Sequence, residues 1–532
     1  MKKNFLIITA FLSGVSVMGV ELSANRLLAP FFGSSQIVWT VIIGLIMIFM
    51  SIGNYFGGKY ADKMENMDKL YRNLFLTGIW VLILPWIGKY VILGITFLLV
   101  FIGIKQVILF GSLLTCLVLF SFPLIMLGTV SPTLVRFGLK DSDKPGEVAG
   151  KIYASSNIGS ILGSFLPTFI TLPLLGTRKS FIFFAMILML LSIIYKLKYR
   201  NIKNVLRHAI VFGITAILFI IPIQESYAFW DDSVIYEGES IYNYLQVKDT
   251  EQYRTFSTNV AFGVQSEIRK NKLLTDAYYD YLLFAPLFNG ASREDKLDIL
   301  ILGYGTGSAD KLFSYYYPNS NVTGVEIDKK IIDIAKEYFD VDTNRTEIHV
   351  MDGRTFLKKD EKKYDLIIVD AYQDVNIPFH MATHEFFEEV KDKLNENGII
   401  SINVNMHNMD ALDLTEGLLK TLNESFECVF TNDVKGSTNL AVIATKTKNN
   451  LTDIRRNIKK NMESKDIINL RERYLLNLNE YTENSKGIIF YDDKAPLEKY
   501  SQKVLQKLVE AELEDIRNQI EGKSVKSLLE LL

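Results

Sequence analysis

The stretch LDILILGYGTGSADKLF, Leu297–Phe313, joins an apolar run to a helical pattern through a loop with three glycines. The apolar run predicts a buried strand, and the spacing that follows predicts a helix. Gly303, Gly305 and Gly307 lie at the turn, where glycine permits unusual dihedrals and lets a ligand approach the backbone. In an open α/β sheet this turn lies at the edge where ligands bind. The stretch therefore predicts a ligand-binding loop.

Strands alternate with helices on both sides of this loop. The alternation over residues 291–500 predicts a doubly wound, largely parallel sheet of the Rossmann-like, methyltransferase type. Its expected strands are LDILILG, NVTGVEID, EIHVMD, YDLIIVD, GIISINV, FECVFTND and NLAVIATK. Residues 226–290 contain short alternating segments that predict a small antiparallel sheet followed by a first helix. Residues 501–532 are expected to form a helical tail.

The first 225 residues are mostly apolar and predict a multi-spanning membrane domain. The opening run, NFLIITAFLSGVSVMGV, has no cleavage site at its end, so it predicts a first span rather than a signal peptide. Further candidate spans are Ile37–Gly58, Asn73–Leu93, Gln106–Gly128, Lys151–Pro173, Phe181–Tyr195 and Ala209–Ile223, with Tyr90–Ile104 as an eighth. Within the first span region, Glu21 and Arg26 are ionisable, and such residues in a membrane are functional-site candidates.

Lysine and arginine gather at the N-terminus and after the second, fourth and sixth candidate spans. The positive-inside rule makes all of these segments cytoplasmic. A complete seventh crossing at Ala209–Ile223 would then place the soluble domain outside, whereas a cytosolic substrate requires it inside. We predict a multi-pass protein of the plasma membrane with a cytoplasmic soluble domain, and the charge pattern leaves that sidedness open.

Composition excludes some other classes. The formal net charge is -2, so nothing indicates nucleic acid as a partner. The two cysteines, Cys116 and Cys428, are far apart and have no metal-ligand spacing, so neither a disulfide nor a zinc site is expected. The partners expected are a small-molecule amine and the membrane, and a homodimer stays open.

Three carboxylates follow successive strands of the expected sheet. Glu326 can accept two hydrogen bonds from a ribose diol, and Asp352 can accept one from an adenine amino group or position its loop. Asp370 ends the next strand, where the reacting centre would lie. A dinucleotide remains an alternative, although GYGTG lacks the spacing that a diphosphate requires. An adenosine-bearing sulfonium fits better because it needs no diphosphate cradle.

The chain resembles the spermidine synthase (polyamine aminopropyltransferase) family, in its bacterial subgroup fused to a membrane region. The resemblance is carried by ELSANRLLAPFFGSSQIVW, GKIYASSNIGSILGSFLPTFITLPLLGTR, ESIYNYLQV, FGVQS, GYGTG, VEID, DGR, VDAYQDVNIPFHMATHEFF and YDDKAPLE. It implies transfer of an aminopropyl group from decarboxylated S-adenosylmethionine, a co-substrate rather than a prosthetic group, to an amine such as putrescine. Methylthioadenosine would be released.

The resemblance also assigns roles to residues. Asp370 matches the catalytic aspartate, which would act as general base. Other matches concern the two substrates: Glu326 for the ribose, Asp352 and Gly353 for the adenine side, Gln265 over the donor, and Tyr278 in the acceptor pocket. Four candidate positions depart from the family pattern: Thr306 and Gln373 where carboxylates are usual, Tyr279 in place of His or Gln, and Asn243 in place of Gln. No metal site is expected.

Two other functions remain open. Thr306 also suits an S-adenosylmethionine-dependent transferase that moves a methyl or another group to a membrane-associated acceptor. A membrane sensor or transporter that binds a nucleoside or polyamine without catalysis is the second alternative, and a base at Asp370 would be unnecessary for it.

Overall fold

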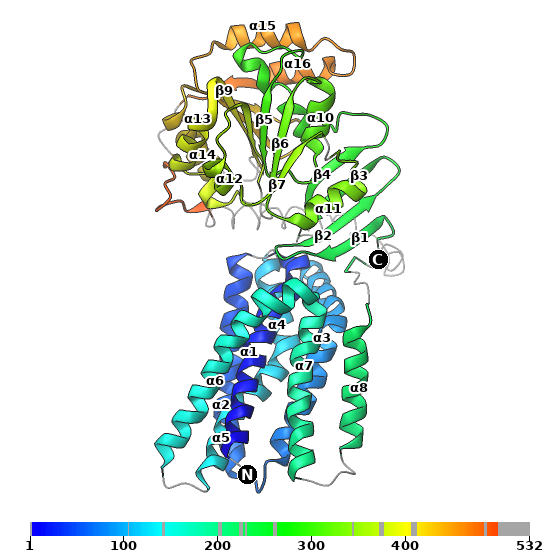
Figure 1. Ribbon diagram of the computed structural model, residues 1–532, viewed down its shortest axis with the longest axis vertical. Coiled ribbons are helices and arrows are strands. Elements are labelled where there is room, and N and C mark those ends of the chain that lie inside the picture. The colour runs from blue at the N-terminus through cyan, green and yellow to red at the C-terminus, as the bar shows by residue number, and fades with distance from the viewer. Residues whose placement is uncertain are drawn as a thin grey trace. The chain divides into compact units, whose positions relative to one another are not determined.

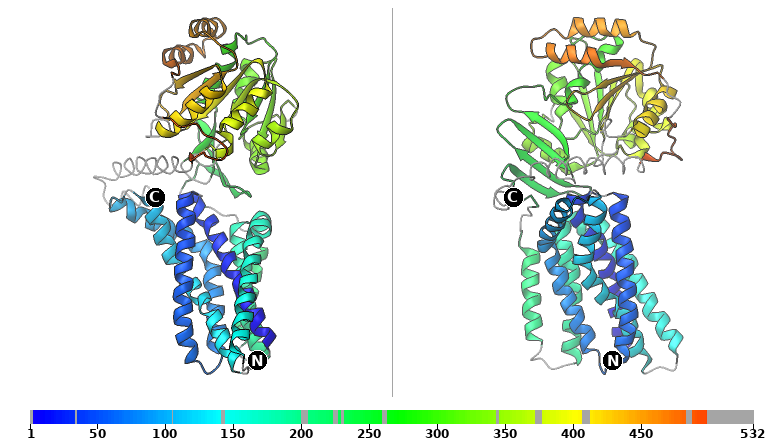
Figure 2. Two further views of the ribbon diagram at one scale, coloured as in Figure 1. Left: turned by 90° about the vertical axis from the view of Figure 1, so that its left-hand side faces the viewer. Right: turned by 180° about the vertical axis from the view of Figure 1, so that it is seen from behind.

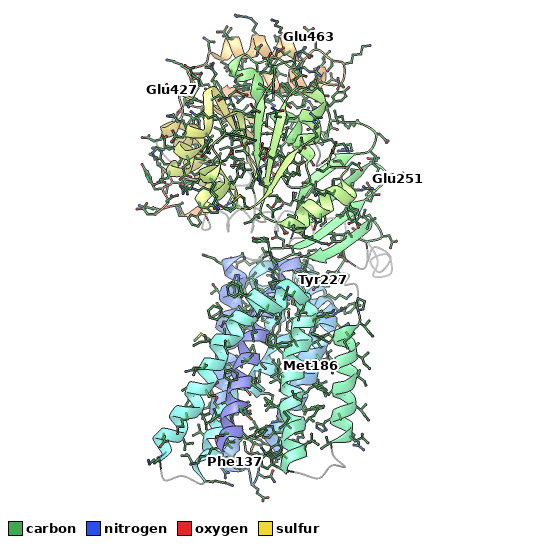
Figure 3. The ribbon with its side chains drawn as sticks, viewed as in Figure 1. Phe137, Met186, Tyr227, Glu251, Glu427 and Glu463 are labelled. Carbon is green, nitrogen blue, oxygen red and sulfur yellow. The ribbon has the colours of Figure 1, made fainter. Side chains whose placement is uncertain are left out.

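The structure is a computed structural model that describes residues 3–33, 35–104, 106–140, 144–199, 205–222, 227–228, 231–258, 263–342, 345–371, 377–405, 412–482 and 487–497 (Figure 1). The chain divides into two compact units (Figure 3 adds their side chains). One, the helical unit, consists mainly of Met1–Phe229, and the other, the soluble unit, mainly of Leu245–Glu512. The short segment Glu239–Tyr244 groups with the helical unit. The predicted tail, residues 501–532, lies outside the described residues.

The helical unit is built from long apolar helices. They are α1 (Lys3–Phe32), α2 (Gln36–Asp62), α3 (Asp68–Phe101), α4 (Val107–Gly128), α5 (Val130–Leu139), α6 (Pro145–Leu166), the π-helix η1 (Pro167–Thr171), α7 (Leu172–Tyr199) and α8 (Leu206–Ile220). Among the described residues, five helical stretches are long and apolar enough to cross a membrane. The last of these, Pro145–Tyr199, joins α6, η1 and α7 and contains non-helical backbone at Gly176.

Some predicted span boundaries are wrong. Tyr90–Ile104 is not a separate span, because α3 continues without interruption from Asp68 to Phe101. Pro85 lies inside this helix, but it does not end it. The candidates Lys151–Pro173 and Phe181–Tyr195 fall mainly on two different helical segments, α6 with η1 and α7, and the chain has non-helical backbone at Gly176 between them. Ala209–Ile223 corresponds to α8, whose 15 residues are fewer than the ~20 needed to cross hydrocarbon.

Helices α1 and α6 pack side by side in parallel. Three close approaches share an offset of 148 residues: Ser155, whose Oγ donates to the Ile7 carbonyl over 2.9 Å, Gly159 against the Phe11 carbonyl, and Gly163 against the Val15 carbonyl. At both glycines an added Cβ would overlap the α1 backbone, so the small residues permit this contact. The π-helix η1 also packs against α1. Because this offset is constant, successive turns of α6 lie beside successive turns of α1 along the contact.

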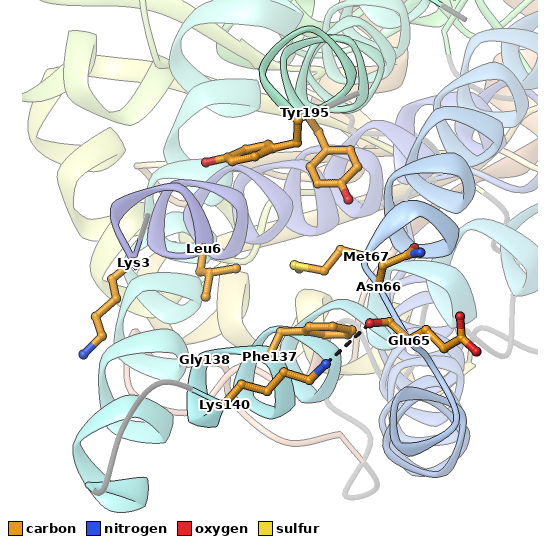
Figure 4. Close-up of a pocket in the computed structure, with 10 residues that line it drawn as sticks. Lys3, Leu6, Glu65, Asn66, Met67, Phe137, Gly138, Lys140 and Tyr195 are labelled. Carbon is orange, nitrogen blue, oxygen red and sulfur yellow. Dashed lines mark hydrogen bonds between the residues drawn. The ribbon is translucent and has the colours of Figure 1, made fainter. Parts of the chain in front are cut away.

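A cavity of about 290 Å³ opens at the end of the helical unit where α1 begins (Figure 4). Its lining consists of Lys3, Leu6, Glu65, Asn66, Met67, Phe137, Gly138, Lys140, Tyr195 and Tyr199. The ammonium group of Lys140 donates to the Glu65 carbonyl over 3.4 Å. Figure 1 shows that α7 ends at this same end and that α8 returns from it.

The soluble unit contains two sheets, as predicted. The small antiparallel sheet has the order β1 (Val234–Glu239), β2 (Tyr244–Asp249), β3 (Tyr253–Thr258) and β4 (Val264–Arg269). The large sheet comprises β5 (Asp298–Leu302), β6 (Asn321–Glu326), β7 (Glu347–Val350), β8 (Tyr364–Val369), β9 (Leu394–Val404), β10 (Cys428–Asp433), β11 (Leu440–Thr445) and β12 (Leu478–Glu480). Its order is β12-β10-β11-β9-β8-β5-β6-β7.

The strand pairs from β7 through β6, β5 and β8 to β9 are parallel, and those from β9 through β11 and β10 to β12 are antiparallel. Helices cover both of its faces (Figures 1 and 2). They are α9 (Tyr279–Leu282), the turn η3 (Ala285–Asn289), α10 (Ser308–Tyr316), α15 (Leu451–Asn461) and α16 (Ile468–Asn477) over one core, and α12 (Gly353–Lys359), α13 (His384–Lys393) and α14 (Leu412–Ser425) over the other. Helix α11 (Lys329–Tyr338) packs against the small sheet.

The strand order reverses at β5. The chain runs from β5 outward through β6 to β7, then returns to β8 on the other side of β5. The carboxyl ends of β5 and β8 therefore form the topological switch point, where open α/β sheets bind ligands. The loop after β5 contains the three glycines, and Asp370 directly follows β8.

Candidate functional site

The glycine loop lies against the end of β8. All three of its glycines have positive φ, from 57° to 88°. At Gly303 the loop approaches the backbone of Asp370 and Ala371 so closely that any Cβ would overlap it. The amide of Asp370 donates to the Leu302 carbonyl over 2.9 Å, which continues the pairing of β8 with β5 to the site. Glycine is therefore required here to bring the loop and the carboxylate together.

Glu326 ends β6 beneath the same loop and is only 8% exposed. Its carboxylate accepts from the amide of Gly305 over 2.9 Å and from the amide of Asp328 over 3.1 Å. Burial raises its pKa, although these two hydrogen bonds oppose the shift. Each oxygen retains a second lone pair, so the carboxylate can still accept from a ligand hydroxyl.

Asp352 follows β7 and begins α12. One carboxylate oxygen accepts from the amide of Thr355 over 2.8 Å as an N-cap, and the other lies 3.1 Å from Nε2 of His380. Burial would raise the pKa of Asp352, but the hydrogen bonds from Thr355 and His380 outweigh it and lower the pKa. Gly353, the first residue of α12, packs against Met381. The aspartate is thus fixed before any ligand contact.

Asp370 is held by donors on both sides. The hydroxyl of Tyr278 donates to one carboxylate oxygen, and Nδ2 of Asn403 donates to the other over 3.2 Å. Burial raises the pKa of Asp370 to about 7, and the charge of Glu326 adds to the shift while both hydrogen bonds reduce it. A carboxylate with a pKa near 7 can accept a proton at neutral pH and give it up again.

Two tyrosines with adjacent, tilted rings connect this carboxylate to the small sheet. The rings of Tyr278 and Tyr279 are 4.0 Å apart, and the Tyr279 hydroxyl donates to the backbone carbonyl of Gln265 on β4. Burial raises the pKa of Tyr278 well above its ordinary value, so its hydroxyl remains a donor. Strand β4 also contacts the glycine loop, where the Thr306 amide donates to Ser266 Oγ over 3.4 Å.

Thr306 is buried, with 1% of its surface exposed, and its hydroxyl has no hydrogen-bond partner among the described residues. Asn243 lies between β1 and β2, in the segment that groups with the helical unit, and donates its amide to Ser240 Oγ over 2.9 Å. Gln373 lies outside the described residues.

Sequence reasoning missed one residue that touches Asp370. Asn403 lies on β9, is 4% exposed, and accepts from Nδ2 of Asn439 over 2.8 Å. Asn439 in turn accepts from the hydroxyl of Ser437 over 2.5 Å. The available signal was an asparagine at the end of the apolar strand GIISINV, beside the strand that leads to Asp370.

A second polar cluster fixes the loop after α12. Arg354 makes paired hydrogen bonds of 2.7 to 2.9 Å to Glu389 and Asp492, and it also donates to the His380 carbonyl. Its side chain is 8% exposed. Asp492 is therefore occupied by an arginine and forms part of the scaffold around Asp352.

The site combines the glycine loop Gly303–Gly307, the buried carboxylate of Glu326 and the hydrogen-bonded carboxylate of Asp370. Asp352, which caps α12, follows the strand next to that of Glu326. The described residues contain no group of three or more His, Cys, Asp or Glu side chains that could hold a metal ion. These residues suit an adenosine-bearing ligand and removal of a proton beside it.

Sequence comparisons relate the chain to one family of known proteins. Residues 277–463 match the family model described as the spermine/spermidine synthase domain. A Bifidobacterium longum protein named "Probable polyamine aminopropyl transferase" is 36% identical over 334 residues, which cover 59% of this chain and 74% of that protein. The polyamine aminopropyltransferase of Vibrio vulnificus is 30% identical over 180 residues, or 32% of this chain and 59% of that protein.

Among solved structures, spermidine synthase from Thermotoga maritima matches with a TM-score of 0.37 and 19% sequence identity. The match covers 44% of this chain and 79% of that one.

Proposed function

The chain belongs to the polyamine aminopropyltransferase family, and from that premise we propose that it transfers an aminopropyl group from decarboxylated S-adenosylmethionine to an aliphatic diamine such as putrescine. Methylthioadenosine is the second product. The observation that carries the proposal is Asp370, held by Tyr278 and Asn403 at the switch point with a pKa of about 7.

The reaction is a displacement at carbon. The amine nitrogen forms a bond to the aminopropyl carbon, the bond from that carbon to sulfur breaks, and its electron pair stays on sulfur as a neutral thioether. A protonated amine has no lone pair for attack, so a base has to take one proton first. In the proposal Asp370 takes that proton and later releases it to water, while Tyr278 and Asn403 keep its carboxylate oriented.

The remaining site residues are assigned to binding. Glu326 binds the ribose, Asp352 and Gly353 contact the adenine side, and the loop Gly303–Gly307 lets the donor approach the backbone. Gln265, Thr306 and Asn243 complete the donor site, and Tyr279 and Gln373 line the acceptor side. This assignment is supported by the position of the loop, Glu326 and Asp370 around one switch point.

A second candidate is transfer of a methyl or another group from S-adenosylmethionine. The observation that favours it is Thr306, a buried neutral side chain in the glycine loop. Without a carboxylate there, the loop neither binds an ammonium strongly nor repels the carboxylate of S-adenosylmethionine.

Mass spectrometry of the nucleoside product distinguishes the two candidates. Full-length protein with decarboxylated donor and putrescine is expected to yield methylthioadenosine and spermidine, and an Asp370→Asn variant almost none. S-adenosylhomocysteine formed from S-adenosylmethionine would support the second candidate. Ligand binding without turnover, unchanged in Asp370→Asn, would contradict both.

We also propose that the helical unit embeds the protein in the plasma membrane with the soluble unit in the cytoplasm. Five apolar stretches support the first part, and the shortness of α8 means that a full last crossing is not required. Cysteines introduced along Ala209–Ile223 test the sidedness: those at the Ile223 end should react only with membrane-permeant thiol reagents. Reaction with an impermeant reagent in intact cells would place the soluble unit outside.

A further inference from the structure

Two buried oxygen acceptors lie one turn apart on α1. Glu21 and Asn25 are each 8% exposed, and their spacing of four residues places them on one face of the helix. Among the described residues, the Glu21 carboxylate has no hydrogen-bond or ion-pair partner, and Oδ1 of Asn25 has no donor. Arg26, five residues further along the chain, donates a hydrogen bond to the Ile241 carbonyl.

A third acceptor comes from η1. Thr171 is 2% exposed, and its hydroxyl also lacks a partner among the described residues. Extended from α6 into η1, the offset of 148 residues would set Thr171 opposite Ser23, which lies between Glu21 and Asn25 in the sequence. The packing of η1 against α1 supports this extension. π-Helical turns inside helices are frequent at functional sites.

These three groups have a chemical feature in common. A carboxylate, an amide oxygen and a hydroxyl oxygen all accept hydrogen bonds, and burying them without donors is unfavourable. In a membrane-spanning helix an unpaired acid of this kind indicates a functional site. A ligand that satisfied all three groups would bring positive charge and several donors.

We propose that Glu21, Asn25 and Thr171 form a binding site in the helical unit for the ammonium group of an aliphatic amine. A primary ammonium has three N–H donors, which matches three acceptors of which one is an anion. The choice of an amine over a proton or a sodium ion rests on the proposed function, since amines are the substrates of that reaction. The cavity in Figure 4 does not suit an amine, because Lys3 and Lys140 line it.

Equilibrium binding of radiolabelled putrescine to the full-length chain in lipid nanodiscs tests the site. Glu21→Gln keeps the shape of the side chain and removes the charge, so we expect the affinity of one class of sites to fall about 10- to 100-fold. Thr77→Val is the matched control, because Thr77 is also buried in a long helix, α3, with an unpartnered hydroxyl. Its isotherm should equal that of the wild type.

A binding isotherm unchanged by Glu21→Gln would overturn the proposal. So would a Glu21-dependent class that sodium ions or protons occupy and putrescine does not displace. If Glu21→Gln does not fold, Thr171→Val carries the test: it removes one hydroxyl, and we expect about 3- to 10-fold weaker binding. No weakening in that variant would then overturn the proposal.

Product formation measured on the same preparations separates this inference from the proposed function. Glu21-sensitive putrescine binding in a protein that makes no methylthioadenosine would leave the inference standing and reject the reaction. Normal turnover with binding that is insensitive to Glu21 and Thr171 would reject the inference alone.

Discussion

Asp370 in the soluble unit and Glu21 in the helical unit are both carboxylates largely withdrawn from solvent, but their surroundings differ. Asp370 accepts hydrogen bonds from Tyr278 and Asn403, whereas Glu21 has no partner among the described residues. A carboxylate that takes a proton during a reaction has to be oriented in advance, and neutral donors do this without removing its basicity. A carboxylate that binds a cation needs oxygen atoms that no hydrogen-bond donor of the protein already occupies. The difference indicates two separate uses of buried charge in one chain.

The largest expected effect follows from removing the held carboxylate. Asp370→Asn keeps the shape and loses the base, so we expect the rate of product formation to fall about 10²- to 10⁴-fold. Steady-state kinetics with methylthioadenosine as the readout measure it. A variant that retains more than a tenth of the rate would show that proton removal occurs elsewhere.

Replacing Arg354 tests how much its ion pairs contribute to the stability of the soluble unit. Arg354→Met leaves Glu389 and Asp492 without their shared arginine donor, and we expect a loss of about 1.5–3 kcal/mol in the free energy of unfolding, because both carboxylates keep some contact with solvent. Chemical denaturation of the full chain in nanodiscs measures the change. Lys329→Met is the control, because the exposed Lys329–Asp333 pair should contribute less than about 0.5 kcal/mol. Equal effects of the two changes would contradict the comparison.

The raised pKa of Asp370 also predicts how stability depends on pH. The folded protein holds the Asp370 proton up to about pH 7, whereas the unfolded chain releases it near pH 3.8. Stability from this group is therefore present below pH 3.8 and is lost as the pH rises to 7. We expect Asp370→Asn to match the wild type at the lowest pH and to exceed it at pH 8, by on the order of 1–3 kcal/mol. Parallel unfolding curves at all pH values would contradict the assigned pKa.

Replacing Tyr278 tests how the hydrogen-bond donors of Asp370 affect its pKa. Its hydrogen bond lowers the pKa of Asp370, so Tyr278→Phe should raise that pKa by about one unit. The pH profile of kcat/KM, which should increase through about pH 7 in the wild type, would shift to higher pH. Tyr317→Phe serves as the control, since Tyr317 is buried but donates to the Leu283 carbonyl. The same shift in both variants would mean that the effect is not local to Asp370.

Replacing Asn403 should give the smallest change in the pH profile of kcat/KM. Its hydrogen bond to Asp370 is longer, at 3.2 Å, so Asn403→Leu is expected to raise the midpoint of the same profile by a few tenths of a unit. A profile unchanged in shape with a lower kcat would instead indicate a role in packing alone.

Much of this site was predictable because its parts lie at strand ends. The spacing of apolar residues located β5, β6, β7 and β8, and each predicted acid lies at the end of one of these strands or within two residues after it. The span boundaries were less predictable, since α3 is one helix with Pro85 inside it, whereas Asn73–Leu93 and Tyr90–Ile104 were predicted as separate spans. Neighbouring helices can maintain a helix through proline, which local sequence does not reveal.

The sequence by itself determined the alternation of strands and helices, the glycine turn and the identity of the acids, because these depend on local spacing and side-chain chemistry. Only the tertiary structure decided which donors reach Asp370 and which residues of α6 pack against α1. Asn403 lies 33 residues from Asp370, and Gly159 packs against the Phe11 carbonyl, 148 residues away in the sequence. Such pairs depend on strand order and helix register, which arise from packing between distant segments and leave no periodic trace in the sequence.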